Sequence, residues 1–368
     1  MNRAKALFLE LLSAAIWERS AESQLFEHID SNLWIQICEL AVSQKVVALI
    51  YDGVISLPTE LHPEKKILFK LHLQTESIEK SNNKVNSVLK KLSAEYEKLN
   101  CPFVLLKGQA NASFYPNPKH RTTGDIDAFL YQKGDYKIAN DWALSKGLEM
   151  KPENIHHQSF KYEGVLIENH KAASYFGIRR FDKLLEEKVA EININNNFLS
   201  INIDGLEVKV LPYEYNAFFL FQHIFHHFIH LGIGIRQLCD WVLFFDRYSS
   251  QIDKGYFLKM VNEFELLYGM QIFASVAVKY LGANPSIFPF ATDTEDEYVD
   301  FVMEDIFRGG SFGYAVFEDK RFRTPLHRKW YSLMCTRKRL RKIHKIAPSH
   351  TANLPLNKLM TNIKILLK

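Results

Sequence analysis

The stretch FVLLKGQANASFYPNPKHRTTGDIDAFL, residues 103–130, decides the fold of this chain. Residues 103–106 form a short apolar run that is closed by Gly108, and this pattern predicts a buried strand. A short helix is expected over residues 108–114, and a second strand over residues 125–131. The stretch therefore predicts strand, helix and strand in close succession.

The sequence that follows extends this pattern into a small sheet. A helix is expected over residues 136–146, and YEGVLIENH, residues 162–170, predicts a third strand. Strands and helices that alternate in this way predict an α/β (α+β) fold with a small mixed β-sheet.

Helical segments flank this core on both sides. Apolar residues recur at helical spacing over residues 1–57, which predicts two or three helices, and over residues 65–99, which predicts one long helix with a single buried face. The sequence from Pro212 onward is chiefly helical in pattern. We therefore expect four regions: an N-terminal helical region (1–99), an α/β core (100–211), a C-terminal helical domain (212–332) and a basic tail (333–368).

The composition is that of a globular protein with an uneven distribution of charge. Of the 368 residues, 47% are apolar and 24% are charged, which argues against disorder. Residues 320–368 hold fourteen Lys or Arg and no Asp or Glu, whereas the first 319 residues hold 32 basic and 42 acidic side chains. A nucleic-acid-binding surface over the whole chain is not indicated, but a local basic patch is expected at the tail.

Neither the cysteines nor the apolar segments indicate a secreted or a membrane protein. The four cysteines lie far apart and form no CxxC pair, a pattern that is typical of free thiols in a reducing cytosol. Glu10 interrupts the N-terminal apolar run, which fits an amphipathic helix better than a secretion signal. The most apolar segment, residues 216–235, contains four histidines and falls short of a membrane span. We expect a cytoplasmic protein without a membrane span.

Two carboxylates one residue apart begin the second predicted strand. Because side chains alternate along a strand, Asp125 and Asp127 are expected to point to the same face. Their mutual repulsion and partial burial would be costly without a cation, and a divalent ion removes that cost. Hard oxygen ligands favour Mg²⁺, with Mn²⁺ as the alternative. The pattern therefore predicts a divalent metal site at this pair.

Gly108 and Glu168 are expected to complete the site. A turn without a side chain at Gly108 lets a phosphate approach backbone N–H groups at the positive end of a helix dipole. Glu168 and His170 share a strand face opposite to Ile167, so Glu168 is expected to bind the metal or to act as base for an attacking hydroxyl. Phosphate at the turn and metal on the next strand are the parts needed for metal-assisted displacement at a nucleotide phosphorus.

Several motifs in the chain resemble those of one family. The motifs are VLLKG (104–108), FYPNP (114–118), Arg121, GDIDAFL (124–130), HLGIGIRQLCDW (230–241) and EDIFRGGSFG (304–313). They resemble the uncharacterised bacterial nucleotidyltransferases of the DNA polymerase β-like superfamily, and the resemblance covers most of the chain. Similar LKG and DxD elements occur in toxin-type nucleotidyltransferases of toxin–antitoxin systems.

The resemblance implies an α/β nucleotidyltransferase core that transfers a nucleoside monophosphate from an NTP, with two metal ions and release of pyrophosphate. At the matching positions it implies metal binding and catalysis by Asp125, Asp127 and Glu168. It also implies nucleotide binding by Lys107, Gly108, Arg121, Gly124, Arg236 and Asp240. Two features depart from the superfamily: Lys-Gly-Gln stands at 107–109 where most members have Gly-Gly or Gly-Ser, and the third acid is Glu168 instead of Asp.

Each of these roles has a structural alternative. Lys107 is equally well a solvated lysine at a strand end, and Glu168 an exposed strand-end carboxylate. Arg121 is equally expected to anchor the turn through carbonyl groups or to pair with an aspartate. Arg236 and Asp240, four residues apart on one predicted helix, are also expected to pair with each other.

Three further features lie in the second half of the chain. Four histidines, His223, His226, His227 and His230, follow one helix face, but no cysteine or acid accompanies them at metal spacing, so a place in the core or along the nucleotide cleft is favoured over a zinc site. RGGSFG, residues 308–313, is expected to be a connection. TRKRLRKIHK, residues 336–345, is expected to be a solvated helix face, with RNA or an acidic partner as the alternative.

The sequence therefore predicts a Mg²⁺-dependent nucleotidyltransferase that moves an NMP from an NTP to an unidentified hydroxyl acceptor. Two other hypotheses stand beside it. One is a non-catalytic module on the same fold that senses NTP or holds a partner, and the other is a toxin-type enzyme that modifies tRNA or protein.

Overall fold

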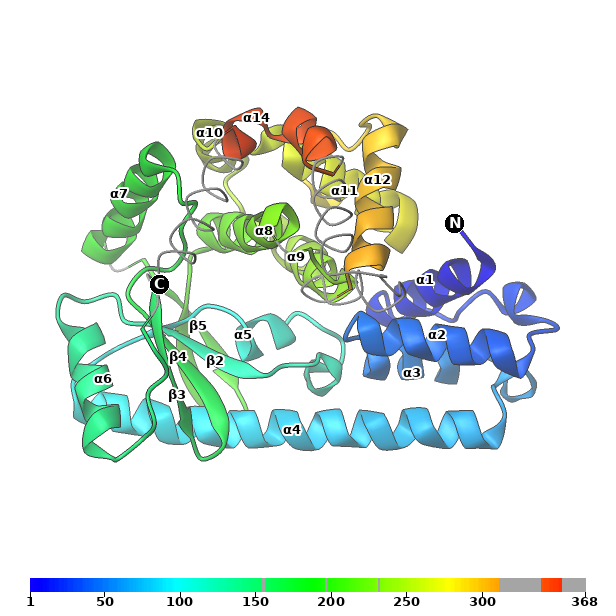
Figure 1. Cartoon of the computed structure of the whole chain (residues 1–368), viewed down its shortest axis with the longest axis horizontal. Helices are drawn as coiled ribbons and strands as arrows, with labels where there is room; N and C mark the ends of the chain where they lie inside the picture. The colour runs from blue at the N-terminus through cyan, green and yellow to red at the C-terminus, as the bar shows by residue number, and fades with distance from the viewer. Residues whose placement is uncertain (154–155, 196, 231, 311–338, 353–368) are drawn as a thin grey trace, which may run out of the picture.

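The computed structural model describes residues 1–153, 156–195, 197–230, 232–310 and 339–352. In this part of the chain, a six-stranded mixed sheet lies in chain order between an N-terminal and a C-terminal helical region, as the sequence predicts; in space, the C-terminal helices lie over both (Figure 1). The N-terminal helices are α1 (Arg3–Ile16), α2 (Ser31–Ser43), α3 (Val47–Ile55) and α4 (Lys65–Lys98).

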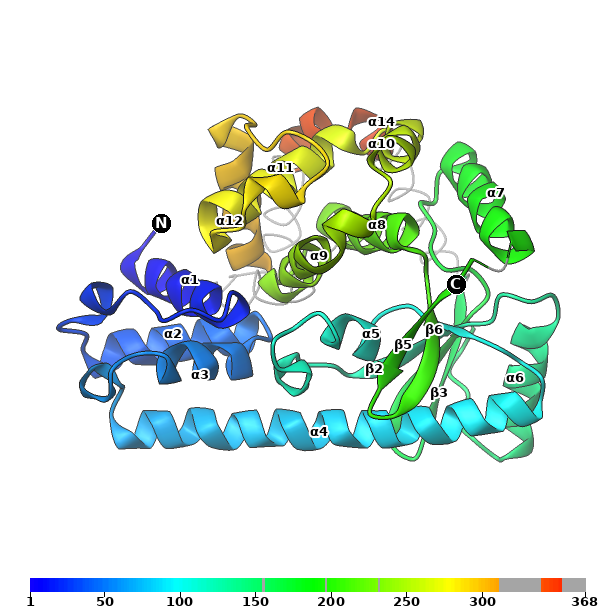
Figure 2. The same ribbon diagram turned by 180° about the vertical axis from the view of Figure 1, so that it is seen from behind.

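Helix α4 spans both the N-terminal region and the sheet. It confirms the long helix predicted over residues 65–99, and its buried side chains, Leu71, Val85 and Leu92 among them, recur along one face. Helices α2 and α3 pack on its first half and strands β2 and β4 on its second half, so one rod supports both parts of the molecule (Figures 1 and 2).

The core contains all six strands. Its elements are β1 (Val104–Leu105), α5 (Gln109–Ala112), β2 (Asp125–Phe129), α6 (Asp135–Ser145), β3 (His157–Tyr162), β4 (Val165–His170), α7 (Arg179–Asn195), β5 (Leu199–Ile203) and β6 (Leu206–Val210). The strand order is β3-β4-β2-β1-β6-β5, and Figure 2 shows the edge formed by β5 and β6. Strands β2 and β4 pair in parallel, as do β1 and β6, whereas the other neighbours are antiparallel.

The strands and helices predicted over residues 103–170 are confirmed. The strands expected at 103–106, 125–131 and 162–170 are β1, β2 and β4, and the helices expected at 108–114 and 136–146 are α5 and α6. Strand β3, helix α7 and the β5–β6 hairpin are additional to that prediction.

The two faces of the sheet belong to two different hydrophobic clusters. Ile126 and Ala128 of β2 pack in a cluster with the second half of α4. Phe129, which points the other way, belongs to the large cluster formed mainly by the N-terminal and C-terminal helices. Because side chains alternate along β2, Asp125 and Asp127 lie on the Phe129 side, facing the C-terminal helices.

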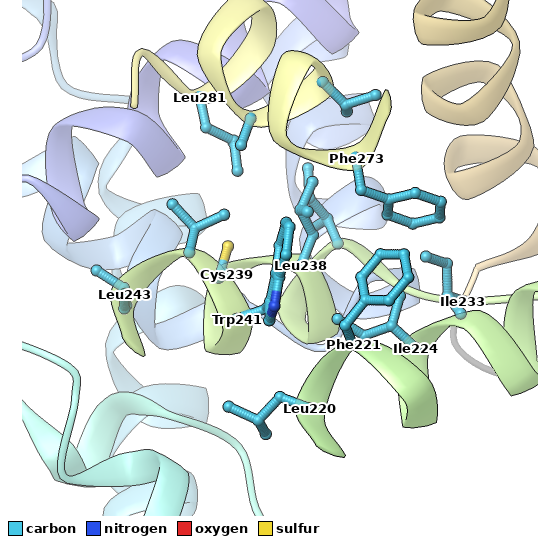
Figure 3. Close-up of a cluster of buried hydrophobic side chains, with 14 of the residues drawn as sticks. Leu220, Phe221, Ile224, Ile233, Leu238, Cys239, Trp241, Leu243, Phe273 and Leu281 are labelled. Carbon is cyan, nitrogen blue, oxygen red and sulfur yellow. The ribbon is translucent and has the colours of Figure 1, made fainter. Parts of the chain in front are cut away.

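The C-terminal region is chiefly helical in its described residues, as predicted. It comprises α8 (Tyr213–His230), α9 (Ile235–Tyr248), α10 (Lys254–Glu263), α11 (Leu267–Leu281), α12 (Asp296–Gly309), a helical segment over 339–346 and α14 (Pro348–Thr351). Trp241 of α9 is fully buried between α8 and α11, and its indole N–H donates to the Ala217 carbonyl at 3.1 Å (Figure 3). This packing holds α8 and α9 against each other, and both helices have other residues that face the sheet across a cavity.

No helix within the described ranges is long and apolar enough to cross a membrane. The cysteines in these ranges, Cys38, Cys101 and Cys239, are free thiols. The four regional boundaries expected from the sequence stay a prediction.

Candidate active site

Three carboxylates meet on one face of the sheet. In the parallel register of β2 and β4, Asp127 lies directly beside Glu168, and Asp125 lies two residues earlier on the same face of β2. One oxygen from each of the three lies within 4.8 Å of the others. The alternation and pairing of two strands therefore gather the three predicted acids at one point.

Asp127 is the buried centre of this group. Its Oδ1 accepts from Lys107 Nζ and from His170 Nε2, each at 2.9 Å. Its Oδ2 is also buried and has no hydrogen-bond partner. Burial alone would raise the pKa of this carboxyl, but Lys107 and His170 lower it well below its ordinary range. Asp127 is therefore a carboxylate with one oxygen satisfied and one available.

The pKa of Asp125 shifts in the opposite direction from that of Asp127. Repulsion from Asp127, together with burial, raises the pKa of Asp125 from 3.8 to about 6. Without a cation, these two acids oppose each other's ionisation, as expected from the sequence.

Lys107 follows β1 and is not a solvated lysine at a strand end. Its side chain is 20% exposed and its ammonium group forms an ion pair with Asp127. Burial would lower the pKa of Lys107, yet the carboxylates of Asp127 and Asp125 raise it overall. The solvated alternative is therefore wrong, and Lys107 is a charged group of the site.

Glu168 is not an exposed strand-end carboxylate either. Its side chain is 17% exposed, and its two oxygens lie 3.5 Å from His157 Nε2 and 3.6 Å from His170 Nε2. Burial would raise the pKa of Glu168, but His170 and His157 lower it. At neutral pH, the site therefore holds Glu168 as an anion.

Gly108 is required by its surroundings. Its φ of +61° is a backbone conformation that favours glycine, and a Cβ at this position would lie 2.9 Å from the Asp125 carbonyl oxygen. Helix α5 has only four residues, so a helix dipole contributes little here. The turn and the first residue of β2 therefore touch backbone to backbone.

We expect Gly108→Ala to destabilise the protein by about 1–3 kcal/mol, because alanine adds strain at positive φ and a close contact. Gly124→Ala is the matched control, since an added Cβ there meets nothing within 4 Å. Urea denaturation of both variants measures the difference. Equal midpoints for the two would contradict this account of the turn.

A buried ion pair fixes this turn to helix α9. Arg121 Nε and Nη2 donate to the two carboxylate oxygens of Asp240 at 2.7 and 2.6 Å, and Arg121 Nη1 donates to the Gly108 carbonyl at 3.0 Å. Asp240 also accepts from the Tyr115 hydroxyl at 2.6 Å and from Asn111 Nδ2 at 3.2 Å. Arg121 therefore binds a carbonyl, that of Gly108, and also pairs with an aspartate, Asp240, so both structural alternatives apply.

Asp240 consequently pairs with Arg121 and not with Arg236, the i,i+4 partner that the sequence offered. Arg236 instead donates to the Thr122 carbonyl. Burial, and then repulsion from Arg121, lowers the pKa of Arg236. Lys107 and Arg236 thus border the same cavity as the carboxylates, so the cavity wall carries both signs of charge.

The cavity itself has a volume of about 410 Å³ and lies between the sheet and helices α8 and α9. Five of the six predicted nucleotide-binding residues line it, together with all three acids: Lys107, Gly108, Arg121, Arg236, Asp240, Asp125, Asp127 and Glu168. Gly124 is exposed immediately before β2 and lies outside this lining.

The row of histidines on α8 forms another wall of the cavity. His223, His226 and His227 line it, and burial lowers the pKa of each, to about 3 for His226 and about 4 for His227. His226 Nε2 lies 3.3 Å from the Tyr175 hydroxyl, and the Tyr175 ring stacks on His156. Among described residues, the groups placed to share a metal do not include this row. These histidines therefore line the cavity as neutral side chains.

Two site residues were not predicted in any role. His157 of β3 and His170 of β4 are cross-strand partners in the antiparallel register, and both imidazoles lie beside Glu168. His170 could have been found, because it shares the strand face of Glu168. His157 required knowledge of how β3 pairs with β4.

The first described residue of the basic segment near the C-terminus, Arg339, is bound internally. Arg339 Nε lies 2.9 Å from both Asp305 carboxylate oxygens, and Arg339 Nη1 donates to the Ile229 carbonyl at the end of α8 at 3.1 Å. This residue is therefore not part of a solvated face, whereas Arg341, His344 and Lys345 of the same helical segment are exposed, as predicted. Residues 311–313 of the glycine cluster and 336–338 of the basic segment lie outside the described residues, and the RNA or acidic-partner alternative stays a prediction.

A comparison with protein families agrees with the motifs. A family model described as an uncharacterised nucleotidyltransferase matches residues 30–282, well over half of the chain. A solved structure entitled "Crystal structure of an antigenic nucleotidyltransferase-like protein from Paracoccidioides brasiliensis" is 14% identical, covers 56% of this chain and 97% of its own, and superposes with a TM-score of 0.33. That likeness is too distant to support an argument. A comparison with curated proteins finds no match.

Proposed function

The chain belongs to the family of uncharacterised nucleotidyltransferases, and from this premise we propose that it is an active, divalent-metal-dependent enzyme. The proposed reaction moves an NMP from an NTP to a hydroxyl acceptor and releases pyrophosphate. The observation that carries the proposal is the unpaired, buried Oδ2 of Asp127 within the group of three carboxylates. A buried anionic oxygen without a partner is costly unless a cation binds it.

The donor set fits Mg²⁺ or Mn²⁺. Asp125, Asp127 and Glu168 would hold the ion through carboxylate oxygens, which hard divalent cations prefer. The raised pKa of Asp125 points the same way, since its charge is opposed in the absence of a cation. When bound, such an ion supplies positive charge that offsets the negative charge on the transferring phosphate and its leaving group.

Lys107 and Arg236 are proposed to bind the triphosphate. Both are cationic side chains on the cavity wall, and Lys107 Nζ already lies beside the acids that define the reacting end of the site. Fixed positive groups aimed at a phosphate stabilise the charge that develops during displacement. We place Glu168 among the ion ligands instead of in the role of base, because it lies beside Asp127 in the strand register and its pKa is lowered.

Arg121, Asp240 and Gly108 are proposed to act by position. Arg121 donates a hydrogen bond to the Gly108 carbonyl and is itself paired with Asp240, so these contacts keep the turn next to β2. A turn that is fixed there leaves room for the triphosphate beside the acids. Gly124 precedes β2, and an added Cβ there would meet nothing within 4 Å. Its proposed contribution is therefore limited to leaving space for the substrate. In the proposed reaction, the acceptor hydroxyl oxygen forms the new bond to the α-phosphorus as the bond to pyrophosphate breaks, and the hydroxyl proton passes to water.

The test is a transfer assay that also identifies the acceptor. The full-length protein is incubated with each of four α-labelled NTPs, Mg²⁺ or Mn²⁺, and fractionated cell extract, and both labelled product and pyrophosphate are measured. We expect one or more NTPs to give labelled product and an equal amount of pyrophosphate. The double variant Asp125→Asn/Asp127→Asn should give neither, whereas Asp141→Asn, an exposed acid on α6, should match the wild type.

The same assay separates the other hypotheses. NTP binding in calorimetry without pyrophosphate in any fraction would favour a non-catalytic sensor and overturn the proposal. Label in a tRNA or protein fraction would support a toxin-type reaction. Transfer by the double variant at the wild-type rate would refute the assigned site.

A further inference from the structure

A second group of ligand-bearing side chains adjoins the three carboxylates. His157, Glu168 and His170 each have one ligand atom within 4.8 Å of the others. The antiparallel register places His157 opposite His170 and Ser159 opposite Glu168, so the group spans the β3–β4 pair on the face of the cavity. Glu168 belongs to both this group and the carboxylate group.

The spacing of these atoms suits a shared cation better than hydrogen bonds. Glu168 Oε1 lies 3.5 Å from His157 Nε2, and Glu168 Oε2 lies 3.6 Å from His170 Nε2. Both distances exceed the usual range for a nitrogen–oxygen hydrogen bond. Two ligands of one zinc-like ion, each about 2.0–2.2 Å from it, lie roughly 3.0–3.5 Å apart. A small inward movement would therefore bring all three side chains onto one ion.

We infer that His157, Glu168 and His170 form a cation position for a first-row transition-metal dication such as Zn²⁺ or Co²⁺. Imidazole nitrogen suits these ions, whereas Mg²⁺ prefers oxygen and is expected at the carboxylate position. The group is partly buried, with side-chain exposures of 23%, 17% and 10% for His157, Glu168 and His170. It is open to the cavity, so an ion can enter from there.

Binding at this position has a defined proton balance. His170 Nε2 donates a hydrogen bond to Asp127 Oδ1, so a metal ion that binds Nε2 must displace this proton, which passes to water. His170 can carry its remaining proton on Nδ1, as metal-binding imidazoles commonly do. The inference goes beyond the proposed function, because it concerns which ion binds and applies whether or not the chain transfers nucleotides.

The histidines of α8 supply the matched control. His226 lines the same cavity as His157, but it is not among the described groups whose ligand atoms lie close enough for a shared ion. If any cavity histidine could bind metal, His226→Gln would weaken binding as much as His157→Gln. The structure predicts that only His157→Gln does so.

The experiment titrates the metal-free, full-length protein with Co²⁺ and follows the visible absorbance of the ion in excess Mg²⁺. We expect the wild type and His226→Gln to bind Co²⁺ equally, and His157→Gln to bind it at least about tenfold more weakly. Equal binding by all three, or loss only in His226→Gln, would overturn the inference. So would complete displacement of Co²⁺ by Mg²⁺.

Crystals of the wild type soaked with Co²⁺ give a second measurement that needs no variant. Anomalous density between His157 and His170 would support the inference, and density only elsewhere would overturn it. Co²⁺ binding in a protein that transfers no nucleotide would leave this inference intact and sink the proposed function. Transfer with Mg²⁺ in a protein that binds no Co²⁺ would support the proposed function and overturn this inference.

Discussion

We expect Asp125→Asn to lose at least about 10²–10³-fold in transfer rate and yet to be more stable than the wild type when no metal is present. The loss follows from removing one of the three carboxylates that are proposed to bind the metal ion. The gain follows from removing a charge that Asp127 and burial oppose. Asp125 is the better choice for this test than Asp127, because the charge of Asp127 balances the buried Lys107.

The stability gain should depend on pH in a defined direction. The folded protein raises the pKa of Asp125 from 3.8 to about 6, so the folded state holds this proton more tightly than the unfolded state. The wild type therefore carries no penalty below pH 3.8 and the full penalty above about pH 7. We expect Asp125→Asn to be more stable by up to about 3 kcal/mol at pH 8 in a chelator, since each pKa unit corresponds to about 1.4 kcal/mol, and by almost nothing near pH 3.

Urea denaturation at both pH values, with the transfer assay in parallel, checks this prediction. Asp141→Asn is the control, since this exposed acid on α6 pairs with Lys137 on the same helix. Added Mg²⁺ should stabilise the wild type and not Asp125→Asn, which reverses their order. A variant that is less stable than the wild type at pH 8 in chelator would show that the two aspartates do not repel each other as described.

The second large effect is a loss of stability, which we expect when the ion pair between Arg121 and Asp240 is broken. Asp240→Asn leaves the Arg121 guanidinium, only 4% exposed, without its counter-charge. Breaking a buried pair in this way costs about 3–5 kcal/mol, because the remaining charge stays out of water. The Asp141→Asn change removes the same charge from an exposed pair and should cost less than about 1 kcal/mol.

Denaturant titration of Asp240→Asn and Asp141→Asn under one set of conditions measures the contrast. If Asp240→Asn fails to fold, its absence from the soluble fraction beside normal Asp141→Asn agrees with the prediction. Equal small losses for the two variants would mean that Arg121 can find water or another acceptor, and that the turn at Gly108 does not depend on α9.

Local patterns in the sequence were sufficient for the part of the site that lies on single strands. Period-two alternation places Asp125 and Asp127 on one face of β2, and Glu168 and His170 on one face of β4, as the structure has them. The 3.6-residue period also predicts α4 correctly, since its buried face continues along the whole helix. These features depend on neighbours within a few residues.

Contacts between distant segments could not be predicted in the same way. The local i,i+4 rule offered Arg236 as the partner of Asp240, but Arg121, 119 residues away in sequence, takes that place. Sequence spacing contains no information about such pairs, because they form only when α9 packs over the turn. Glu168 could be proposed for the site, but its position beside Asp127 depends on how β4 pairs with β2.

The missed strands have two different causes. The β3–β4 turn places Glu163 and Gly164 at φ values of +48° and +81°, and glutamate is an unusual residue in that conformation, so the sequence carried little turn signal. The β5–β6 hairpin turns at Asp204 and Gly205, a pair that favours tight hairpin turns, between two alternating apolar segments. That hairpin was readable from the sequence, whereas β3, and with it His157, was not.

The support of the turn by Asp240 also bears on protein synthesis. All three acids precede residue 170, but the partner of Arg121 lies seventy residues further along the chain. A ribosome-bound chain that has emerged only as far as β6 therefore lacks Asp240, the partner of Arg121, and the turn at Gly108 is not yet anchored to α9. The arrangement of the turn seen in the folded protein therefore forms only after α9 has left the ribosome.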